Sequence, residues 1–278
     1  MEDDARCSED IFYADCPIRS LTPFIGESYI REDGGVIVFP NAWIHAEVDV
    51  PEEFHYDTSI SVHSRSTFAR LGLDMCITQG EFQRILLKKG PLTRIHVTII
   101  NEGVWPVVIR EGDTVAVASM SKLFPLFVER VHLHAGNTRM EIIEEHLSTF
   151  EIPRLGIIRY IDPSYVAQGQ YACTVSFSTM DLRVGDYEVV SIEEYIAIPE
   201  NCIGIMVPAT DYMIFFNSSV LVYPGWSGHL AVEFKAHQDM ELASGMHLAD
   251  MLLFQNYRPL ASYSGKYNKQ RQQSIEPR

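Results

Sequence analysis

The stretch PGWSGHLAVEF at residues 224–234 decides the fold that we expect for this chain. Two glycine-containing turns, Pro-Gly and Ser-Gly, lead directly into an apolar run of the kind that forms β-strands. One carboxylate, Glu233, stands near the end of that run between Val232 and Phe234. Successive strand residues point to opposite faces, so Glu233 faces away from both apolar neighbours. If that face is a partly apolar pocket, the pKa of Glu233 rises and it can transfer protons near neutral pH; if it is solvent, Glu233 is an ordinary surface residue.

The composition indicates a globular protein and disfavours nucleic acid and membranes as partners. The chain has 278 residues, of which 46% are hydrophobic and 21% charged, enough for one large or two ordinary domains. Its formal net charge is −15, which disfavours binding to nucleic acid and to acidic membranes. A small anion could still bind where basic side chains gather locally.

The cysteines and the amino-terminal residues indicate an intracellular location. The five cysteines are scattered and include no Cys-x-x-Cys pair, which favours neither a disulfide framework nor a structural zinc site. The first ten residues are acidic and polar, so they do not resemble a signal peptide, and no apolar run approaches the roughly 18 residues of a membrane span. We expect a cytoplasmic protein, or, for a viral product, one made in the host cytosol or nucleus.

Short β-prone runs bounded by turns recur along the first half of the chain. Many short strands at this spacing are typical of a sandwich or barrel, so we predict a mainly β fold. The runs that carry this prediction lie at residues 35–40, 43–51, 59–63, 95–101, 104–109 and 110–117.

The composition changes between residues 129 and 153. The run MEIIEEHL at 140–147 places apolar residues at helical spacing among charges, and Pro153 would end a helix there. We therefore predict a short helical linker over 129–153 between two β-domains, the first at residues 1–128 and the second at 154–278.

The second half repeats features of the first. Residues 189–199 echo 43–51, and residues 240–249 echo 107–116, with Gly245 at the place of Gly112. This pattern predicts two tandem copies of one β-domain. Chance similarity between β-meanders is the alternative.

The two copies differ where a site would lie. The first copy carries RSTFARLGL at residues 65–73 and has Thr98 at the place of Glu233; the second has Glu233, with Asn-Ser-Ser (217–219) aligned to the Arg-Ser segment. We infer that each half keeps a different part of one site. Together with Arg65 and Arg70, the basic residues of the carboxyl-terminal tail would concentrate the positive charge that polyphosphate recognition needs, unless they are ordinary surface pairs and a solvated tail.

These motifs resemble those of the dCTP deaminases, members of the dUTPase-like superfamily. RSTFARLGL is similar to that family's arginine-serine motif, PGWSG followed by Glu233 to its turn and catalytic glutamate, and GKYNKQ (265–270) to its closing segment. Ordinary members carry all three in a single-domain chain, whereas here they are split over two copies, as in the double-length members. The resemblance implies two tandem dUTPase-like domains of β-barrel or jelly-roll type.

The resemblance also implies an activity: zinc-independent hydrolytic deamination of dCTP, or a modified dCTP, to dUTP and ammonia. Glu233 would be the general acid and base, Ser66 would hold the water or the base edge, and Arg70 would fix Glu233. Magnesium would arrive bound to the substrate triphosphate. The residues expected to bind the substrate are Arg65, Thr67, Trp226, Lys266, Tyr267 and Gln270.

Other functions stay open. A dUTP diphosphatase needs an aspartate that this chain lacks at the matching places, since Tyr223 precedes the Pro-Gly turn and the first copy reads ITQGEF at 77–82. A catalytically inactive nucleotide-binding or regulatory protein is a second alternative. The assembly could be a monomer with an intramolecular site or a homo-oligomer.

Two short histidine patterns are candidates for metal binding. His45-Ala46-Glu47 matches half of a zinc-deaminase signature whose Pro-Cys-x-x-Cys half the sequence lacks. His132 and His134 could bind a metal, although an alternating His pair of this kind is usually a surface feature of a strand or linker.

Overall fold

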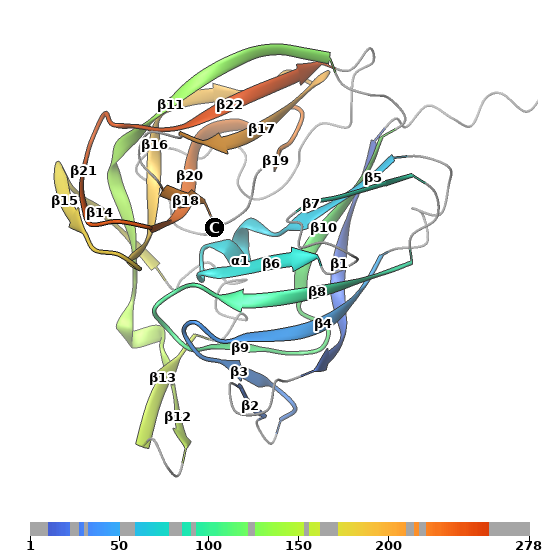
Figure 1. Ribbon diagram of the computed structural model, residues 1–278, viewed down its shortest axis with the longest axis vertical. Helices are drawn as coiled ribbons and strands as arrows, with labels where there is room; N and C mark the ends of the chain where they lie inside the picture. Colours follow the sequence, from blue (N-terminus) through green and yellow to red (C-terminus); the bar gives the residue numbers. More distant parts are fainter. Residues whose placement is uncertain are drawn as a thin grey trace, which may run out of the picture.

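The computed structural model describes residues 11–22, 28–30, 33–50, 59–77, 85–89, 93–121, 126–152, 156–161, 172–209, 214–216 and 221–255. Most of them form strands in two large curled sheets, one from each half of the chain (Figure 1). The predicted fold class, mainly β with two domains of barrel type, is confirmed.

The first sheet contains seven strands wound around one long bent strand. Strand β1 pairs with β10 over its first part and with β4 over its second, with a register shift at Cys16/Pro17. Proline lacks the N–H that a regular ladder needs, so a bulge is where a strand tolerates it. In spatial order the strands are β6 (Leu73–Ile77), β8 (Arg94–Asn101), β4 (Trp43–Asp49), β1 (Ile11–Thr22), β10 (Thr114–Ser121), β5 (Ser59–Ser64) and β7 (Ile85–Lys89).

The second sheet is built in the same way around β11. That strand pairs with β22 along its first part and with β16 and β14 (Ala172–Ser176) along its second. In spatial order its main strands are β18 (Ile214–Phe216), β20 (Ser227–Ala236), β16 (Tyr187–Ala197), β11 (Leu126–Ile142), β22 (His247–Gln255), β17 (Cys202–Pro208) and β19 (Leu221–Val222).

The two sheets have the same topology. Read in spatial order, the seven strands of the first match the seven main strands of the second one by one, and the matched strands also occur in the same order along the chain. Smaller pairings match as well. β3 (Val36–Val38) pairs with β9 (Val107–Ile109) on one side and with β2 (Ser28–Ile30) on the other, and β15 (Thr179–Leu182) pairs with β21 (Met240–Ala243).

Equivalent turns lie at equivalent places. The Gly112 N–H donates to the Ile18 carbonyl at 2.8 Å, and the Gly245 N–H donates to the Ala135 carbonyl at 2.7 Å. Both glycines have positive φ, 88° and 86°, which favours a residue without a Cβ. The structure therefore places Gly245 where Gly112 lies, as the sequence predicts.

A second pair of turns aligns the strands that matter most. Asn41 donates its N–H to Asn101 at 2.7 Å, and Gly185 donates to Ala236 at 2.9 Å, again with positive φ at both donors. Thr98 on β8 and Glu233 on β20 each lie three residues before their acceptor. They therefore occupy equivalent positions in the two domains.

The predicted alignment of residues 217–219 with the Arg-Ser segment is wrong. The Arg65 N–H donates to Val115 at 2.9 Å, and the Ala209 N–H donates to Leu248 at 2.9 Å, so Ala209 stands where Arg65 stands. The predicted alignment fails because the second copy has fewer residues between Ala209 and its next strand, β18, than the first has between Arg65 and β6. Residues 217–219 themselves lie outside the described part of the chain.

The predicted helix in the linker is also wrong. Residues 126–142 form β11, the central strand of the second sheet, and the only helical residues in the described part of 129–153 are a 3₁₀ turn, η2 (Glu144–His146). A hairpin of β12 (Ser148–Ile152) and β13 (Gly156–Tyr160) follows. Helical spacing misled here because β11 bends and changes partners, so its buried residues do not alternate regularly.

The second half of the chain packs directly against the first domain. Met140, Leu147, Ala172 and Val189 belong to the same buried cluster as the core of the first domain. Ile161 continues beyond β13 to pair with Val107, the start of β9. The contact between the halves is therefore apolar and extensive, and only the cluster centred on Phe234 and Leu248 belongs to the second domain alone.

No helix among the described residues is both long and apolar enough to span a bilayer.

Candidate active site

A one-turn helix of the first domain carries the arginine-rich motif. Helix α1 (Ser66–Ala69) follows β5 directly, and backbone bonds from Phe68 and Ala69 to the Arg65 carbonyl, at 2.9 and 3.2 Å, close its single turn. Arg70 comes immediately after the helix and is 4% exposed. Figure 1 shows α1 and β6 on the side of the first domain that faces β18 and β20.

Gly72 fixes the direction in which the chain leaves α1. Its φ is +81°, and a Cβ placed there would lie 2.4 Å from the Cα of Gly103, a contact that real Cβ atoms do not make. The Gly72 carbonyl accepts backbone N–H groups from Glu102 at 2.7 Å and Gly103 at 3.1 Å. The turn that carries Arg70 is thereby anchored to the loop after β8.

Glu233 lies near the end of β20, where both faces of the strand are covered. Val232 and Phe234, both 0% exposed, point into the core of the second domain, and Glu233 is 2% exposed on the opposite face. The alternation of strand side chains aims Glu233 toward the first domain. It is therefore a buried carboxylate, and the alternative of a solvent-facing glutamate is excluded.

The structure brings Glu233 and Arg70 together across the two halves of the chain. Arg70 Nε lies 3.6 Å from Glu233 Oε1, and both side chains are almost fully buried. That separation is too long for a hydrogen bond through Nε but lies within the range of an ion pair. Away from water, attraction between the two groups is little screened.

The pKa of Glu233 is raised from its ordinary value to about 7. Burial is the main cause, because removing a carboxylate from water disfavours its charged form. The Arg70 guanidinium acts in the opposite direction and offsets part of the shift. A group with this pKa is divided between acid and base forms near neutral pH, as proton transfer requires.

Two polar contacts between the halves lie next to this pair. The Tyr187 hydroxyl, at the start of β16, donates to the carbonyl of Ala69, the residue before Arg70. Lys235 Nζ, two residues after Glu233 on β20, donates to Glu102 Oε2 at 2.7 Å and to Asn41 Oδ1 at 3.3 Å. Both contacts hold the second domain against the turn that carries Arg70.

Sequence reasoning did not identify Tyr187, Lys235 or Glu102. For Lys235 a signal existed, since residues two apart on a strand share a face with one another, here Glu233 and Lys235. For Tyr187 and Glu102 none existed, because their partners come from the other half of the chain.

The equivalent position of the first domain carries a different pair. Thr98 is 4% exposed, and its Oγ1 lies 3.0 Å from His45 Nδ1 on the neighbouring strand β4. A hydroxyl and an imidazole of the same domain thus occupy the place that Glu233 has in the second. Of these two equivalent strand positions, one therefore carries a carboxylate, Glu233, and the other a threonine, Thr98.

Apart from Trp226, the remaining predicted site residues whose side chains the structure describes are Thr67 and Arg65. Thr67 is buried within α1 at 9% exposure, and Arg65 makes an ion pair with Asp15, with Nη1 and Oδ2 at 3.6 Å. Ser66 begins α1, but its side chain lies outside the described part of the chain. The predicted contacts of the tail, Lys266, Tyr267 and Gln270, also lie outside the described residues.

Trp226, which the sequence predicts to bind the substrate, lies in the turn before β20. Trp226 is 5% exposed and belongs to the core of the second domain. It precedes β20, seven residues before Glu233, which corresponds to roughly 20 Å along a strand. The Trp-containing turn therefore has a packing role.

Comparisons with known proteins give a likeness of fold. No protein-family model matches the sequence, and no curated protein matches it significantly. Among solved structures, the chain is similar to the 2′-deoxycytidine 5′-triphosphate deaminase of Agrobacterium tumefaciens, with a TM-score of 0.65 and 11% sequence identity over 89% of each chain. Because the aligned share exceeds either half, the likeness spans both domains. It shows that this chain shares the fold of that protein.

Proposed function

We propose that this protein is a deaminase that converts dCTP, or a modified dCTP, and water to dUTP, or the corresponding uracil nucleotide, and ammonia. The observation that carries the proposal is the buried pair of Glu233 and Arg70, 3.6 Å apart, contributed by opposite halves of a chain with the dCTP deaminase fold. An acid of pKa about 7 beside a fixed guanidinium has the properties of a general acid and base.

In the proposed reaction Glu233 moves the proton. Its carboxylate takes a proton from water, and the resulting hydroxide forms a bond to the pyrimidine carbon that bears the amine. The proton passes from Glu233 to the ring nitrogen, giving a tetrahedral carbon. Glu233 then takes the proton of the new hydroxyl group and passes it to the amine, so that the C–N bond breaks, ammonia leaves and the carbonyl of uracil forms. No redox step or co-reactant other than water is needed.

Arg70 has two parts in this scheme. Its positive charge holds Glu233 in place and limits how far burial raises the pKa of the acid, so that the base form is present near neutral pH. The same charge stabilises negative charge that develops as the tetrahedral carbon forms. Ser66, which begins the helix before Arg70, would hold the attacking water or the base edge.

The triphosphate would be bound by basic residues around this centre. Arg65 and Thr67 lie in the segment that leads into Arg70, and Lys266, Tyr267 and Gln270 of the tail would close over the nucleotide. Magnesium would enter with the triphosphate, because it lowers the cost of placing that charge in a protein of net charge −15. Zinc has no part in the proposed reaction.

We further propose that the chain arose by duplication of one dUTPase-like domain. The matching strand order supports this, as do the matching turns at Gly112 and Gly245. After duplication each copy could lose the half of the site that its neighbour supplied, which accounts for Thr98 in one and Ala209 in the other. One composite site per chain is compatible with a monomer and with a homo-oligomer.

A scan of deoxynucleotides for ammonia release tests the proposal. We expect release from dCTP by the wild type and a loss of at least about a hundredfold in Glu233→Gln, since general acid–base catalysis contributes about 10²–10⁴-fold. Glu188→Gln is the matched control, because Glu188 is a carboxylate on the neighbouring strand that pairs with Arg139 and also has a raised pKa from burial. Full activity in Glu233→Gln would refute the assignment.

A second candidate is a catalytically inactive nucleotide-binding protein. The near-complete burial of Glu233 and Arg70 favours it, since a pair closed from solvent can also serve as a structural ion pair. Calorimetry with dCTP and dUTP separates the two: binding without ammonia or diphosphate release identifies the inactive binder, and diphosphate release from dUTP identifies a diphosphatase.

A further inference from the structure

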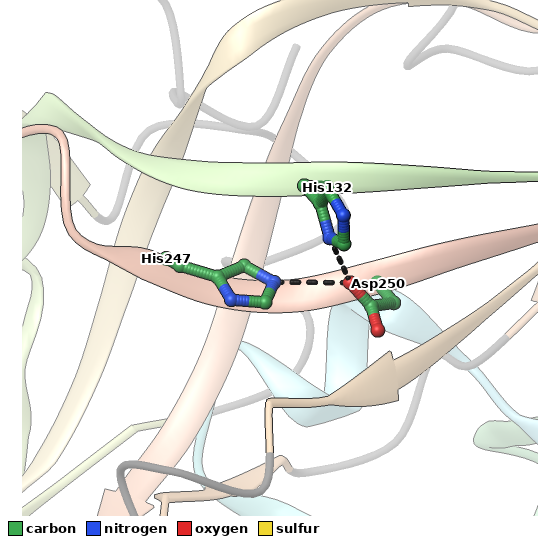
Figure 2. A group of neighbouring side chains, drawn as sticks. All are labelled: His132, His247 and Asp250. Carbon is green, nitrogen blue, oxygen red and sulfur yellow. Dashed lines mark hydrogen bonds and ion pairs between the residues drawn. The ribbon is translucent and has the colours of Figure 1, made fainter.

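A cluster of histidines and carboxylates lies on the outer face of the second sheet, on strands that do not carry Glu233. His132 comes from β11, and His247 and Asp250 come from the adjacent strand β22 (Figure 2). His134, also on β11, lies beside them. His132 lies directly opposite Asp250, and His134 opposite His247. None of these four residues has a role in the proposed deamination.

A β-bulge brings His247 and Asp250 to the same face. Residues three apart on a regular strand point to opposite sides, but the register between β11 and β22 shifts at Leu133/His134 and skips Leu248. Leu248 and Ala249 are consequently both buried, while His247 and Asp250 both point outward. Bulges re-aim side chains in this way and recur next to functional sites.

Three ligand atoms converge as a result. His132 Nδ1 lies 2.7 Å and His247 Nε2 lies 3.0 Å from the same Asp250 oxygen, Oδ1. These three atoms all lie within 4.8 Å of one another. Ligand atoms around a tetrahedral metal are roughly 3.3 Å apart for bonds of about 2.0–2.1 Å, so opening the two short distances by a few tenths of an ångström makes room for an ion.

We propose that His132, His247 and Asp250 form a binding site for a divalent transition-metal ion. Two imidazoles and one carboxylate suit Zn²⁺, Co²⁺ or Ni²⁺, whereas Mg²⁺ and Ca²⁺ prefer oxygen ligands alone. The His132 side chain is 61% exposed, so water can reach the site and complete the coordination. The site is separate from the metal-independent chemistry proposed for Glu233.

Neighbouring groups indicate which atoms of Asp250 and His247 would bind the metal. Arg130 Nη1 lies 3.7 Å from Asp250 Oδ2, which leaves Oδ1 as the metal-binding oxygen. His247 Nε2 also lies 3.0 Å from the Ala249 carbonyl, a contact that it gives up when it binds a metal.

His134 flanks the cluster and lies outside the ligand set. Its ring centroid is 5.6 Å from that of His247, and Glu194 accepts from its backbone N–H at 2.9 Å and contacts its Nδ1 at 2.6 Å. Glu194 thus holds His134 beside His247.

A metal at this place would tie together the first and last strands of the second sheet. β11 begins that sheet in the chain and β22 ends it, and the three ligands bridge the two strands. An ion that binds only the folded form raises the midpoint of thermal unfolding, and the rise grows with the logarithm of its free concentration above the dissociation constant. The consequence is a protein stabilised by zinc and returned to its original midpoint by EDTA.

Titration of the full chain with ZnCl₂ in a calorimeter, and with CoCl₂ by absorption, tests the site. We expect one ion per chain, with affinity reduced at least about tenfold in His132→Gln and Asp250→Asn, since loss of even a supporting residue costs about 10–100-fold. MgCl₂ in excess should not displace the ion. Circular dichroism of each variant establishes that it is folded.

The matched control is His96→Gln, which removes an exposed histidine from β8 of the first domain. It should bind zinc as the wild type does and show the same rise in unfolding midpoint. Absence of binding by the wild type at millimolar zinc overturns the proposal, as does unchanged affinity in folded Asp250→Asn or an equal loss in His96→Gln.

Discussion

Burial raises the pKa of Glu233 and so favours its neutral form over the carboxylate. Its pKa of about 7 in the folded chain exceeds the value of 4.5 that an exposed glutamate has. Below pH 4.5 the carboxyl is neutral in both the folded and the unfolded chain. As pH rises from 4.5 to 7 the unfolded chain releases a proton that the folded chain keeps, so the free energy of unfolding falls.

This linkage predicts how stability depends on pH. Compared with Glu233→Gln, the wild type should lose about 1.4 kcal/mol per pH unit in the middle of this interval, on the order of 3 kcal/mol in all, with no further relative change above pH 7. Denaturant unfolding of both proteins between pH 4.5 and 8 measures the difference. Glu188→Gln, which keeps Glu233, should retain most of the decline. Parallel curves for the wild type and Glu233→Gln would show that Glu233 is already ionised in the folded protein.

At the scale of an element, the turn after α1 places Arg70. It depends on the close approach of Gly72 and Gly103, which no residue with a Cβ can reproduce. In the sequence Arg-Leu-Gly-Leu (70–73), the glycine is required by backbone packing, whereas the arginine is required by its charge beside Glu233.

Gly72→Ala should consequently be far more damaging than a glycine change elsewhere. Gly34 has a similar φ of +79° but nothing within 4 Å of an added Cβ, so Gly34→Ala should cost only the left-handed strain, about 1–2 kcal/mol. Gly72→Ala adds a backbone clash at 2.4 Å, and we expect a loss of more than twice that amount. Thermal unfolding of the two variants makes the comparison. Similar losses would mean that the loop around Gly103 moves aside without cost.

At the scale of the whole molecule, the site depends on how the two halves meet. Apolar residues of the second half join the core of the first, and the Lys235–Glu102 pair adds a partly buried polar contact. The side chains of Lys235 and Glu102 are 19% and 24% exposed, so solvent screens their attraction in part.

A double-mutant cycle of Lys235→Met and Glu102→Gln measures this contact. We expect a coupling free energy of about 1 kcal/mol, because both groups are more buried than surface pairs but not fully desolvated. If the pair also orients Glu233 toward Arg70, ammonia release from dCTP should fall in each single variant and fall little further in the double variant. A coupling energy of zero, with strictly additive losses of activity, would assign the pair no part in joining the domains.

The sequence by itself determined the local features of this protein. Alternation and turn residues indicated most of the strands, the repeat indicated two similar domains, and the apolar neighbours of Glu233 marked it as unusual. These features are recorded in residues close together in the chain, where periodicity and turn chemistry act.

Only the tertiary structure decided which groups meet. The 162 residues between Arg70 and Glu233 hold no local pattern that sets their 3.6 Å contact, which arises from the packing of one domain on another. The same holds for β11, whose helical spacing was overridden by pairing with β22, β16 and β14, and for His132 and Asp250, 118 positions apart. Long-range pairing and burial contribute more free energy than local propensity, so they set these contacts.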